Sequence, residues 1–172
     1  MDVVYQPDVI ARRVRELGEE ITEYYDTEEL LLLGTLKGSF MFMADLVRSI
    51  SRAHLLEFIV AASYGKGVTS SGHVRLLYDP QAVFEGKHVL LIEDIVDSGA
   101  TLNRLVRLLR TRDPLSLEIC TLLHKHVAPN LMLEPRFVGF DAPADFLIGY
   151  GLDFAEQYRH LPFIGSLQEV DG

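Results

Sequence analysis

The stretch Val89–Thr101, VLLIEDIVDSGAT, decides the fold of this chain. Four apolar residues come first, and two acids, Glu93 and Asp94, follow them directly. An apolar run with no polar alternation is typical of a strand that is buried on both faces of a parallel sheet. The segment Asp97–Thr101 then supplies a glycine and two hydroxyl side chains just before a helical pattern begins. The stretch therefore predicts a strand, a turn and the start of a helix.

The turn has the composition of an anion-binding site. Backbone N–H groups at the start of a helix carry partial positive charge and lack partners within the helix, so they favour a phosphate. Ser98 and Thr101 add two hydroxyl donors, and Gly99 lets the backbone approach a ligand closely. Ligands of open α/β sheets bind outside the carboxyl ends of the strands, which is where this turn falls. We expect it to hold a phosphate group.

Glu93 and Asp94 would repel a phosphate, so their place beside the turn requires another partner. Carboxylates accept hydrogen bonds from sugar hydroxyls, and they bind Mg²⁺ directly or through its waters. A sugar phosphate with magnesium would satisfy the acids and the turn together. The simpler alternative is an ordinary capped helix, with Asp97 or Ser98 as the N-cap residue and the two acids in contact with solvent.

On both sides of this stretch, predicted strands alternate with predicted helices. The apolar residues Ile10, Val14, Leu17 and Ile21 are spaced as on one face of a helix. In chain order, the expected elements are a helix at 7–25, a strand at 30–34, a helix around 43–50, strands at 54–61 and 89–92, a helix around 102–109 and a strand at 117–123. This alternation indicates right-handed βαβ units, and therefore an α/β fold with a mainly parallel, twisted sheet flanked by helices.

The last part of the chain has a different pattern, with short strands at 137–140 and 146–150 and a final one near 163–165. We interpret about 137–167 as a flap on the same domain. A length of 172 residues with 48% hydrophobic content predicts one domain that spans 1–172. The polar stretch 63–73 is either an exposed connection or a lid over an active site, and its composition leaves both open.

The charge balance excludes some classes of partner. Lys and Arg number 16 and Asp and Glu number 25, so the net charge is −9, which disfavours binding to a nucleic-acid backbone. No apolar run approaches the ~20 residues of a membrane span, and no export signal is visible at the N-terminus. Cys120 is the only cysteine, and its apolar neighbours make it most simply a core residue. We expect a cytoplasmic protein without a membrane or nucleic-acid partner.

Other ligand-binding patterns are absent or incomplete. The Walker pattern does not occur, and the glycine spacing of dinucleotide-binding loops fails at the third glycine. His124 and His126 would share one face of a strand and could in principle ligate zinc, although no third ligand is obvious nearby. The alternative for this pair is a strand end that reaches solvent.

Glu93–Thr101 resembles the phosphoribosyl pyrophosphate (PRPP) signature of the type I phosphoribosyltransferases. Three further segments resemble the hypoxanthine-guanine branch of this family: Leu36–Ser39 its pyrophosphate-binding turn, Ser63–Gly65 its mobile loop and Asp145–Asp153 its purine flap. The match continues through 158–162 and covers most of the chain. It implies the type I phosphoribosyltransferase fold, with a mobile loop at 63–73 that includes Ser63 and Tyr64, and a small purine-binding hood.

The resemblance implies an enzyme of purine salvage. The reaction would be a magnesium-dependent transfer of the phosphoribosyl group from PRPP to hypoxanthine, and also to guanine, giving IMP or GMP and pyrophosphate. Family members are usually homodimers or homotetramers. Two alternatives stay open: a nucleotide-sensing, RNA-binding regulator on the same fold, and a phosphoribosyltransferase that prefers xanthine, adenine or a pyrimidine. A regulator that binds RNA should have a basic face, which the net charge disfavours.

The resemblance also implies roles for the residues around PRPP. Asp97 would be the general acid/base. Glu93 and Asp94 would hold the ribose hydroxyls and Mg²⁺, and Asp153 would bind Mg²⁺ near the pyrophosphate. The residues implied to bind PRPP or its phosphates are Lys37, Gly38, Glu93, Asp94, Asp97, Ser98, Gly99, Ala100, Thr101 and Arg159. The peptide between Leu36 and Lys37 is typically cis in the family.

For the purine, the resemblance implies a site made by Lys125, Phe146, Leu147 and Asp153. Lys125 would donate to the six-oxo group, Phe146 would stack on the base, and Leu147 would contact the ring edge through its backbone. Taken alone, Lys125 is more simply a solvated lysine and Phe146 a core residue. The segment 126–135 does not align with the family pattern and could affect subunit contacts or the base pocket. Asp145, the acid before Phe146, also departs from the pattern, which leaves the choice between hypoxanthine and guanine open.

Overall fold

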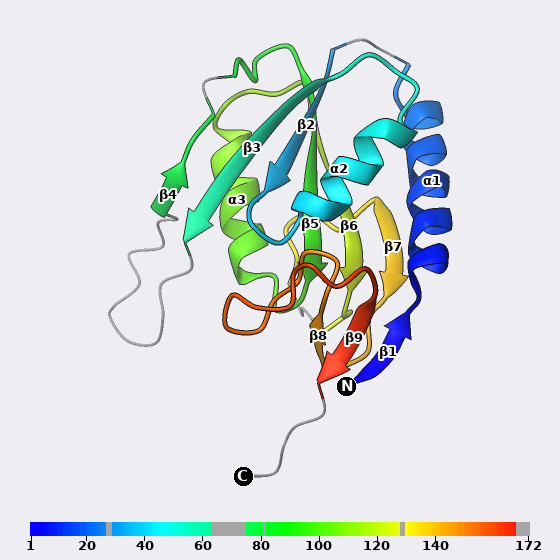
Figure 1. Cartoon of the computed structure of the whole chain (residues 1–172). Helices are drawn as coiled ribbons and strands as arrows, with labels where there is room; N and C mark the ends of the chain where they lie inside the picture. Colours follow the sequence, from blue (N-terminus) through cyan, green and yellow to red (C-terminus); the bar gives the residue numbers. More distant parts are fainter. Residues whose placement is uncertain (27–28, 63–74, 81, 128–129, 168–172) are drawn as a thin grey trace.

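The computed structural model describes residues 1–26, 29–62, 75–80, 82–127 and 130–167. Among them, six strands form the main sheet in the order β4–β3–β2–β5–β6–β7 (Figure 1). Their bounds are β2 (Leu30–Thr35), β3 (Leu55–Ala62), β4 (Arg75–Tyr78), β5 (His88–Val96), β6 (Ser116–His124) and β7 (Phe137–Asp141). β4 is antiparallel to β3, and the other neighbours are parallel. The mainly parallel α/β sheet is as predicted.

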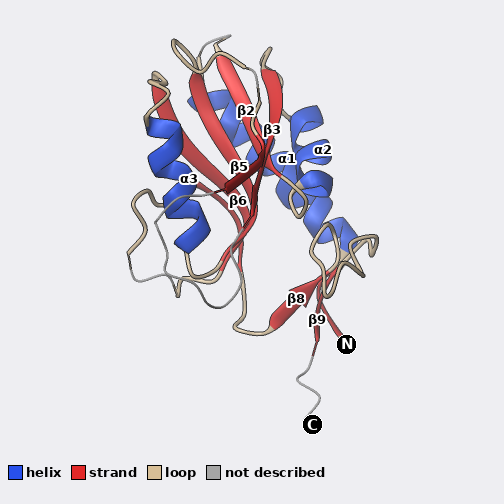
Figure 2. Ribbon diagram, turned by 90° about the vertical axis from the view of Figure 1, so that its left-hand side faces the viewer, coloured by secondary structure: helices blue, strands red, loops and turns tan. Residues whose placement is uncertain are grey.

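Helices cover both faces of this sheet, as Figure 2 shows. α1 (Pro7–Tyr24) and α2 (Phe40–Ser49) lie on one face, and α3 (Ala100–Arg110) lies on the other. In β2, Leu30 and Leu32 belong to the core under α1 and α2, whereas Leu31 and Leu33 belong to the core under α3. All four are fully buried, which explains why the strand has no polar alternation. The predicted helical face of α1 is buried as well.

A second, smaller sheet lies beyond the carboxyl ends of the main strands (Figure 1). It has the order β1–β9–β8, with β1 (Asp2–Tyr5), β8 (Phe146–Ile148) and β9 (Ile164–Leu167), and both pairings are antiparallel. We call this sheet and the connection at 149–163 the hood. No helix in the described part of the chain is both long and apolar enough to cross a membrane.

The predicted flap at 137–167 is wrong at its start. Phe137–Asp141 pairs in parallel with β6 and forms the edge of the main sheet, so the hood begins only at β8. A short apolar run fits either sheet, and its partner is decided by register, which the local pattern does not contain. Neither β1 nor β4 is among the expected elements, because both are short and lie at the edge of a sheet.

Register brings the ends of β5 and β6 together. Val96 is paired with His124, and the next residue, Lys125, donates its backbone N–H to the carbonyl of Val96 at 3.0 Å. The turn after β5 and the residues after β6 therefore leave the sheet side by side, below the arrowheads in Figure 1 and next to the hood. Cys120 is fully buried within β6, and burial raises the pKa of its thiol, as a core cysteine requires.

Candidate active site

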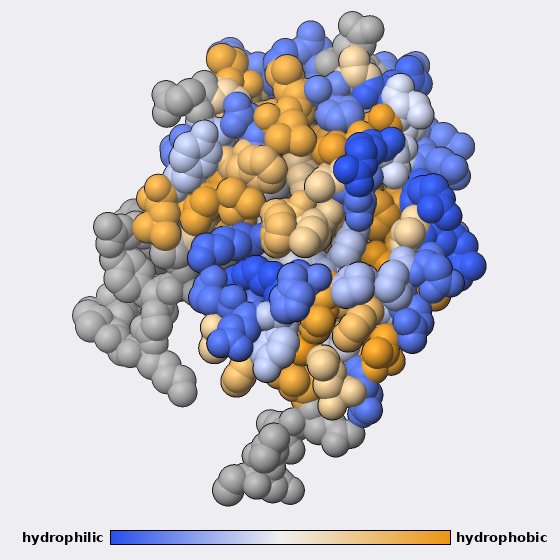
Figure 3. Space-filling model, viewed as in Figure 1, coloured by the Kyte–Doolittle hydropathy of each residue, from blue (hydrophilic) through white to orange (hydrophobic). Residues whose placement is uncertain are grey.

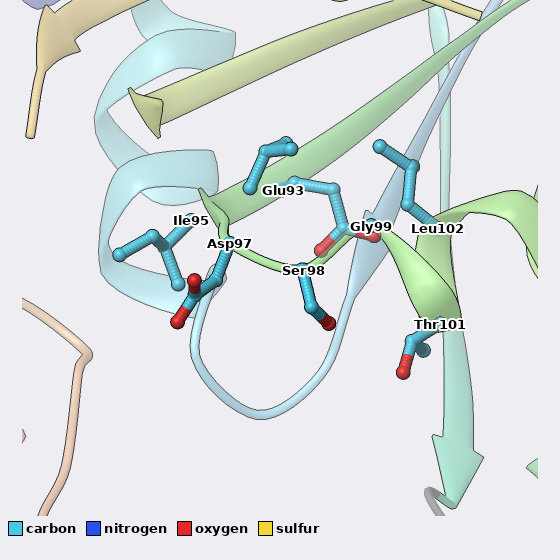
Figure 4. Close-up of a pocket in the computed structure, with 8 residues that line it drawn as sticks. Glu93, Ile95, Asp97, Ser98, Gly99, Thr101 and Leu102 are labelled. Atoms are coloured by element: carbon cyan, nitrogen blue, oxygen red, sulfur yellow. The ribbon is translucent and has the colours of Figure 1, made fainter. Parts of the chain in front are cut away.

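The turn after β5 forms one wall of a pocket, shown in Figure 4. Asp97 and Ser98 are exposed, and Gly99 is buried with a φ of 75°, a left-handed conformation that suits glycine. α3 begins at the next residue, Ala100, and its first N–H groups face the same turn. The oxygen-bearing side chains of Asp97, Ser98 and Thr101 gather along this turn in Figure 4. This turn, residues 97–101, thus lines a pocket at the start of a helix, and we call it the phosphate turn after the group predicted to bind there.

Glu93 lines this pocket, and Asp94 is the next residue of β5. Glu93 accepts a hydrogen bond from the Thr35 hydroxyl at 2.6 Å, and Asp94 accepts one from the backbone N–H of Ile95 at 2.8 Å. Burial, and then the neighbouring Asp94, raises the pKa of Glu93 to about 8. Burial also raises the pKa of Asp94, against the opposing effect of Arg159. Within the described part of the chain, neither acid has an ion-pair partner.

Such a pair of acids fits a divalent cation. Two carboxylates that are crowded and short of water gain most from a bound positive charge, because it removes both causes of their raised pKa values. Oxygen ligands are the ones that Mg²⁺ prefers, and it commonly takes one or two carboxylates together with substrate phosphates. No group of three or more His, Cys, Asp or Glu side chains that could hold a metal by themselves is found among the described residues. The two acids therefore fit a cation that arrives with a phosphorylated substrate.

The loop between β2 and α2 packs against Asp94 and against the hood connection. Its Leu36–Lys37 peptide is cis. A Cβ added at Gly38 would overlap the Asp94 carboxylate, and a Cβ added at Gly151, whose φ is 101°, would overlap the carbonyl of Gly38. The Gly38 backbone is thus packed between the Asp94 side chain and the hood connection. Three segments meet at this point without room for a methyl group.

Lys125 and Asp97 are brought together across the ends of β5 and β6. The Lys125 Nζ lies 3.4 Å from a carboxylate oxygen of Asp97 and 3.4 Å from the Ala144 carbonyl. Only 12% of the Lys125 side chain is exposed, so it is not the solvated lysine of the simpler alternative. The structure therefore brings together an ammonium group and a carboxylate beside the phosphate turn, although 27 residues separate them in the sequence.

The hood supplies an exposed aromatic side chain. Phe146 is 51% exposed, so it is not a core residue, and its ring lies edge-on to that of Phe154 with the centroids 5.6 Å apart. The neighbouring Leu147 is buried in the core under α1 and α2. One strand therefore anchors the hood through Leu147 and presents Phe146 outwards, as the alternation of β8 requires.

Lys37 and Arg159 are held by acids of the hood connection. The Lys37 Nζ lies 2.8 Å from a Glu156 carboxylate oxygen. Arg159 donates to the Gly151 carbonyl at 2.8 Å and pairs with Asp153 at 3.0 Å. Lys37 and Arg159 come from distant parts of the sequence and both contact Glu156, so the structure brings them to one place. Gly151, which accepts from Arg159, packs against Gly38, and Gly38 packs against Asp94, so this group lies near the paired acids.

Some contacts of the site were not expected from the sequence. Thr35, which bonds Glu93, ends a strand and has no pattern of its own. Tyr150 donates from its hydroxyl to Asp45 of α2 at 2.6 Å and so ties the hood to that helix. Glu156 lies in a turn that local composition does not distinguish from other polar loops. The predicted mobile loop, with Ser63 and Tyr64, lies outside the described residues.

The rings of His124 and His126, the pair considered as zinc ligands, are 3.9 Å apart, and His126 is hydrogen-bonded to Asp141 at 2.5 Å. Burial and the neighbouring His126 lower the pKa of His124, so this ring is favoured in its neutral form. After this pair, residues 130–133 lie against α3, where Asn103 bonds the backbone on both sides of Leu131. This part of 126–135 therefore covers the α3 face.

Comparisons with known proteins agree with this geometry. Residues 2–155 match the family model described as the phosphoribosyl transferase domain. The hypoxanthine-guanine phosphoribosyltransferase of Dictyostelium discoideum is 49% identical over 172 aligned positions, and the alignment covers 98% of this chain and 96% of that protein. The hypoxanthine phosphoribosyltransferase of Escherichia coli strain K12 is 43% identical over 173 aligned positions, gaps included, and the alignment covers 99% of this chain and 97% of that protein.

Solved structures give the same result. The crystal structure of a hypoxanthine-guanine phosphoribosyltransferase from Bacillus anthracis superposes with a TM-score of 0.91 at 40% identity, and the match covers 98% of this chain and 99% of that one. The phosphate turn, the paired acids, the two cations beside the β2–α2 loop and the aromatic hood all lie within the matched part. The chain belongs to the hypoxanthine-guanine branch of the phosphoribosyltransferase family.

Proposed function

We propose that this enzyme transfers the phosphoribosyl group of PRPP to a ring nitrogen of hypoxanthine or guanine and releases pyrophosphate. The observation that carries the proposal is the placement of Asp97 3.4 Å from Lys125, beside the phosphate turn. In this reaction the bond from the anomeric carbon to pyrophosphate breaks, a bond to the purine nitrogen forms, and the purine loses its ring proton. The products are IMP or GMP, which makes the reaction a step of purine salvage.

The phosphoribosyl group would lie along the carboxyl end of β5. The turn at 97–101 would hold the 5-phosphate through its N–H groups and the hydroxyls of Ser98 and Thr101, and Gly99 leaves space for the phosphate to approach. Glu93 and Asp94 would accept hydrogen bonds from the ribose hydroxyls. Lys37, Arg159 and the backbone of Gly38 would bind the pyrophosphate. The anomeric carbon then lies between the turn and these cations.

The purine would bind between the end of β6 and the hood. Lys125 is a donor without an acceptor function, so it favours a carbonyl oxygen at the six position and disfavours the amino group of adenine. The exposed ring of Phe146 would stack on the base, and the backbone of Leu147 would meet the ring edge. Asp97 would take the purine proton as the nitrogen attacks, which is the role of a general base.

Mg²⁺ is the cofactor that the pocket acids fit. Glu93 and Asp94 would hold it at the ribose, and Asp153 would hold it near the pyrophosphate. When bound, Mg²⁺ offsets part of the negative charge of the leaving group. This matters because PRPP carries about five negative charges and must enter a protein with a net charge of −9. We expect little binding of PRPP without the metal.

A second copy of the chain is the partner that the surface supports. In the described part of the chain, large apolar side chains are exposed on β3, on β4 and just after β4, and the upper left of Figure 3 contains orange atoms. They are Leu55, Leu56, Leu77, Tyr78 and Val83. Apolar surface of this kind favours association between subunits. Light scattering should show an oligomer that Leu77→Lys breaks and the control Leu115→Lys does not.

The decisive test is nucleotide formation from PRPP with hypoxanthine, guanine, xanthine and adenine, each with and without Mg²⁺. Magnesium-dependent formation of IMP and GMP, with adenine inactive, is the expected result. Faster turnover of xanthine would favour the xanthine-preferring alternative. Binding of PRPP without turnover of any base would favour the regulator, which the net charge of −9 and the buried Lys125 both oppose. A reaction on free cytoplasmic nucleotides and a lone buried thiol also fit a cytoplasmic enzyme.

A further inference from the structure

We propose that Glu156 is a built-in competitor of pyrophosphate: its carboxylate occupies the cations of the leaving-group site and is displaced when pyrophosphate or PRPP binds. The inference rests on the proposed function, because it takes Lys37 and Arg159 as the cations that bind the diphosphate. It goes further in assigning a role to a residue that binds neither substrate. Glu156 would set how tightly the enzyme holds its leaving group.

The contacts of Glu156 are those that a phosphate would make. One carboxylate oxygen accepts from the Lys37 Nζ at 2.8 Å, and the other lies 3.4 Å from a guanidinium nitrogen of Arg159. A single anionic group thus joins two cations from separate segments of the chain. A diphosphate has the same chemistry, since it presents negatively charged oxygens at similar spacing to Lys and Arg donors. Both groups are negatively charged, so the carboxylate at the Lys37 Nζ opposes a diphosphate that approaches the same ammonium group.

The backbone holds Glu156 in this position. Ala155 and Glu156 have φ values of 51° and 65°, which residues other than glycine rarely adopt. The turn is closed by reciprocal hydrogen bonds between Phe154 and Gln157 at 3.2 and 3.0 Å, and the Glu156 N–H donates to Asp153 at 2.8 Å. These bonds fix the backbone independently of the side chain. The carboxylate can therefore leave Lys37 without unfolding the turn.

The other contacts of Lys37 and Arg159 show why Glu156 competes with the diphosphate and is not needed to position the two cations. Arg159 is positioned by the Gly151 carbonyl at 2.8 Å and by Asp153 at 3.0 Å, so it keeps its place without Glu156. Lys37, in contrast, has Glu156 as its ion-pair partner. The side chains of Lys37 and Glu156 are 67% and 65% exposed, so the pair is open to an incoming anion.

This arrangement has a consequence for turnover. Before PRPP binds, Glu156 keeps the two cations neutralised, and after the reaction it pairs with Lys37 again as pyrophosphate leaves. The Glu156 carboxylate thus weakens the binding of PRPP and of pyrophosphate in the same way, by competing for Lys37. The purine lies at the other end of the site, beside Lys125, so its binding should be independent of Glu156.

The test compares Glu156→Gln with Glu85→Gln. Glu85 is exposed in the turn before β5, at the amino ends of the parallel strands, whereas the site lies at their carboxyl ends. The control therefore removes the same charge far from the site. In Glu156→Gln we expect the inhibition constant of magnesium pyrophosphate and the KM of PRPP to fall about two- to fivefold, the range for one exposed ion pair. The KM of hypoxanthine and the midpoint of thermal unfolding should not change. Glu85→Gln should resemble the wild type.

Two outcomes would overturn the inference. Weaker pyrophosphate binding in Glu156→Gln would mean that Glu156 positions Lys37, and a change no larger than that of Glu85→Gln would mean that it does not compete. In a Lys37→Gln background, Glu156→Gln should have a smaller effect than in the wild type; an equal effect would also contradict the mechanism. Titration calorimetry with magnesium pyrophosphate gives the same comparison without turnover. A wild type that forms no nucleotide from any purine would instead contradict the proposed function.

Discussion

Gly38→Ala should damage the site while leaving the fold intact. A methyl group at this position would lie 2.5 Å from the Asp94 Cγ and closer still to a carboxylate oxygen, whereas real Cβ contacts begin at about 3.0 Å. The backbone cannot retreat, because the carbonyl of Gly38 lies against Gly151. Asp94 must therefore rotate away and give up its hydrogen bond from the Ile95 N–H. Gly38→Ala thus moves the Asp94 carboxylate out of the site, although Asp94 itself is unchanged.

The size of the effect follows from what Asp94 holds. A hydrogen bond to a charged group contributes about 1.5–3 kcal/mol, which corresponds to about 10- to 150-fold in kcat/KM. We expect a loss of this size for PRPP at saturating magnesium and hypoxanthine. The unfolding free energy should fall by about 1–3 kcal/mol, because the Ile95 N–H loses the carboxylate that accepts its hydrogen bond, and a loss of this size leaves the protein folded.

Steady-state kinetics with PRPP as the varied substrate and a thermal unfolding curve check both parts. Asp94→Asn is the matched comparison, because it removes the charge without adding volume. If Gly38→Ala acts through the carboxylate, the double variant should be no worse than the worse single variant. Turnover of Gly38→Ala within twofold of the wild type would refute the reasoning, as would a loss of activity that is fully explained by unfolding.

Three further predictions concern single side chains of the pocket. Asp97→Asn should lower kcat about 100- to 10,000-fold with little change in the KM of PRPP, and wild-type turnover would contradict its role as general base. Lys125→Ala should lower kcat/KM for hypoxanthine about 10- to 150-fold. The ratio of kcat/KM for hypoxanthine to that for adenine should fall as well, and assays with both bases in parallel measure it. Because the pKa of Glu93 is raised to about 8 in the folded state, folding is favoured while this carboxyl group is protonated. This contribution to the free energy of unfolding is lost as the pH rises through about 8. Without metal, Glu93→Gln should therefore raise the thermal midpoint relative to the wild type at pH 9 and not at pH 5.

Local patterns were sufficient to predict the centre of the fold. The apolar runs of β2, β5 and β6 are continuous because each strand is buried under helices on both faces, and this burial appears directly in the sequence. The phosphate turn was equally visible, since Gly99 and the hydroxyls around it are adjacent in the chain. The residues of this turn are neighbours along the sequence, so a local pattern is enough to identify them.

The other half of the site depends on register and on distant pairings. Asp97 and Lys125 meet because Val96 pairs with His124, and no local signal contains that register. Phe137–Asp141 was assigned to the flap for the same reason, although it joins the main sheet. The purine and pyrophosphate roles therefore came from the resemblance to the family and not from the spacing of residues.

The hood also determines the order in which the two sheets can fold during synthesis of the chain. Asp2 pairs with Ser166, so the first strand of the chain finds its partner only when nearly all of the sequence has been made. The main sheet from β2 to β7 can assemble earlier, because its strands lie close together along the chain. During synthesis β1 therefore stays an unpaired strand, and the sheet that presents Phe146 forms last. An incomplete chain would have its phosphate turn in place before it could bind a base.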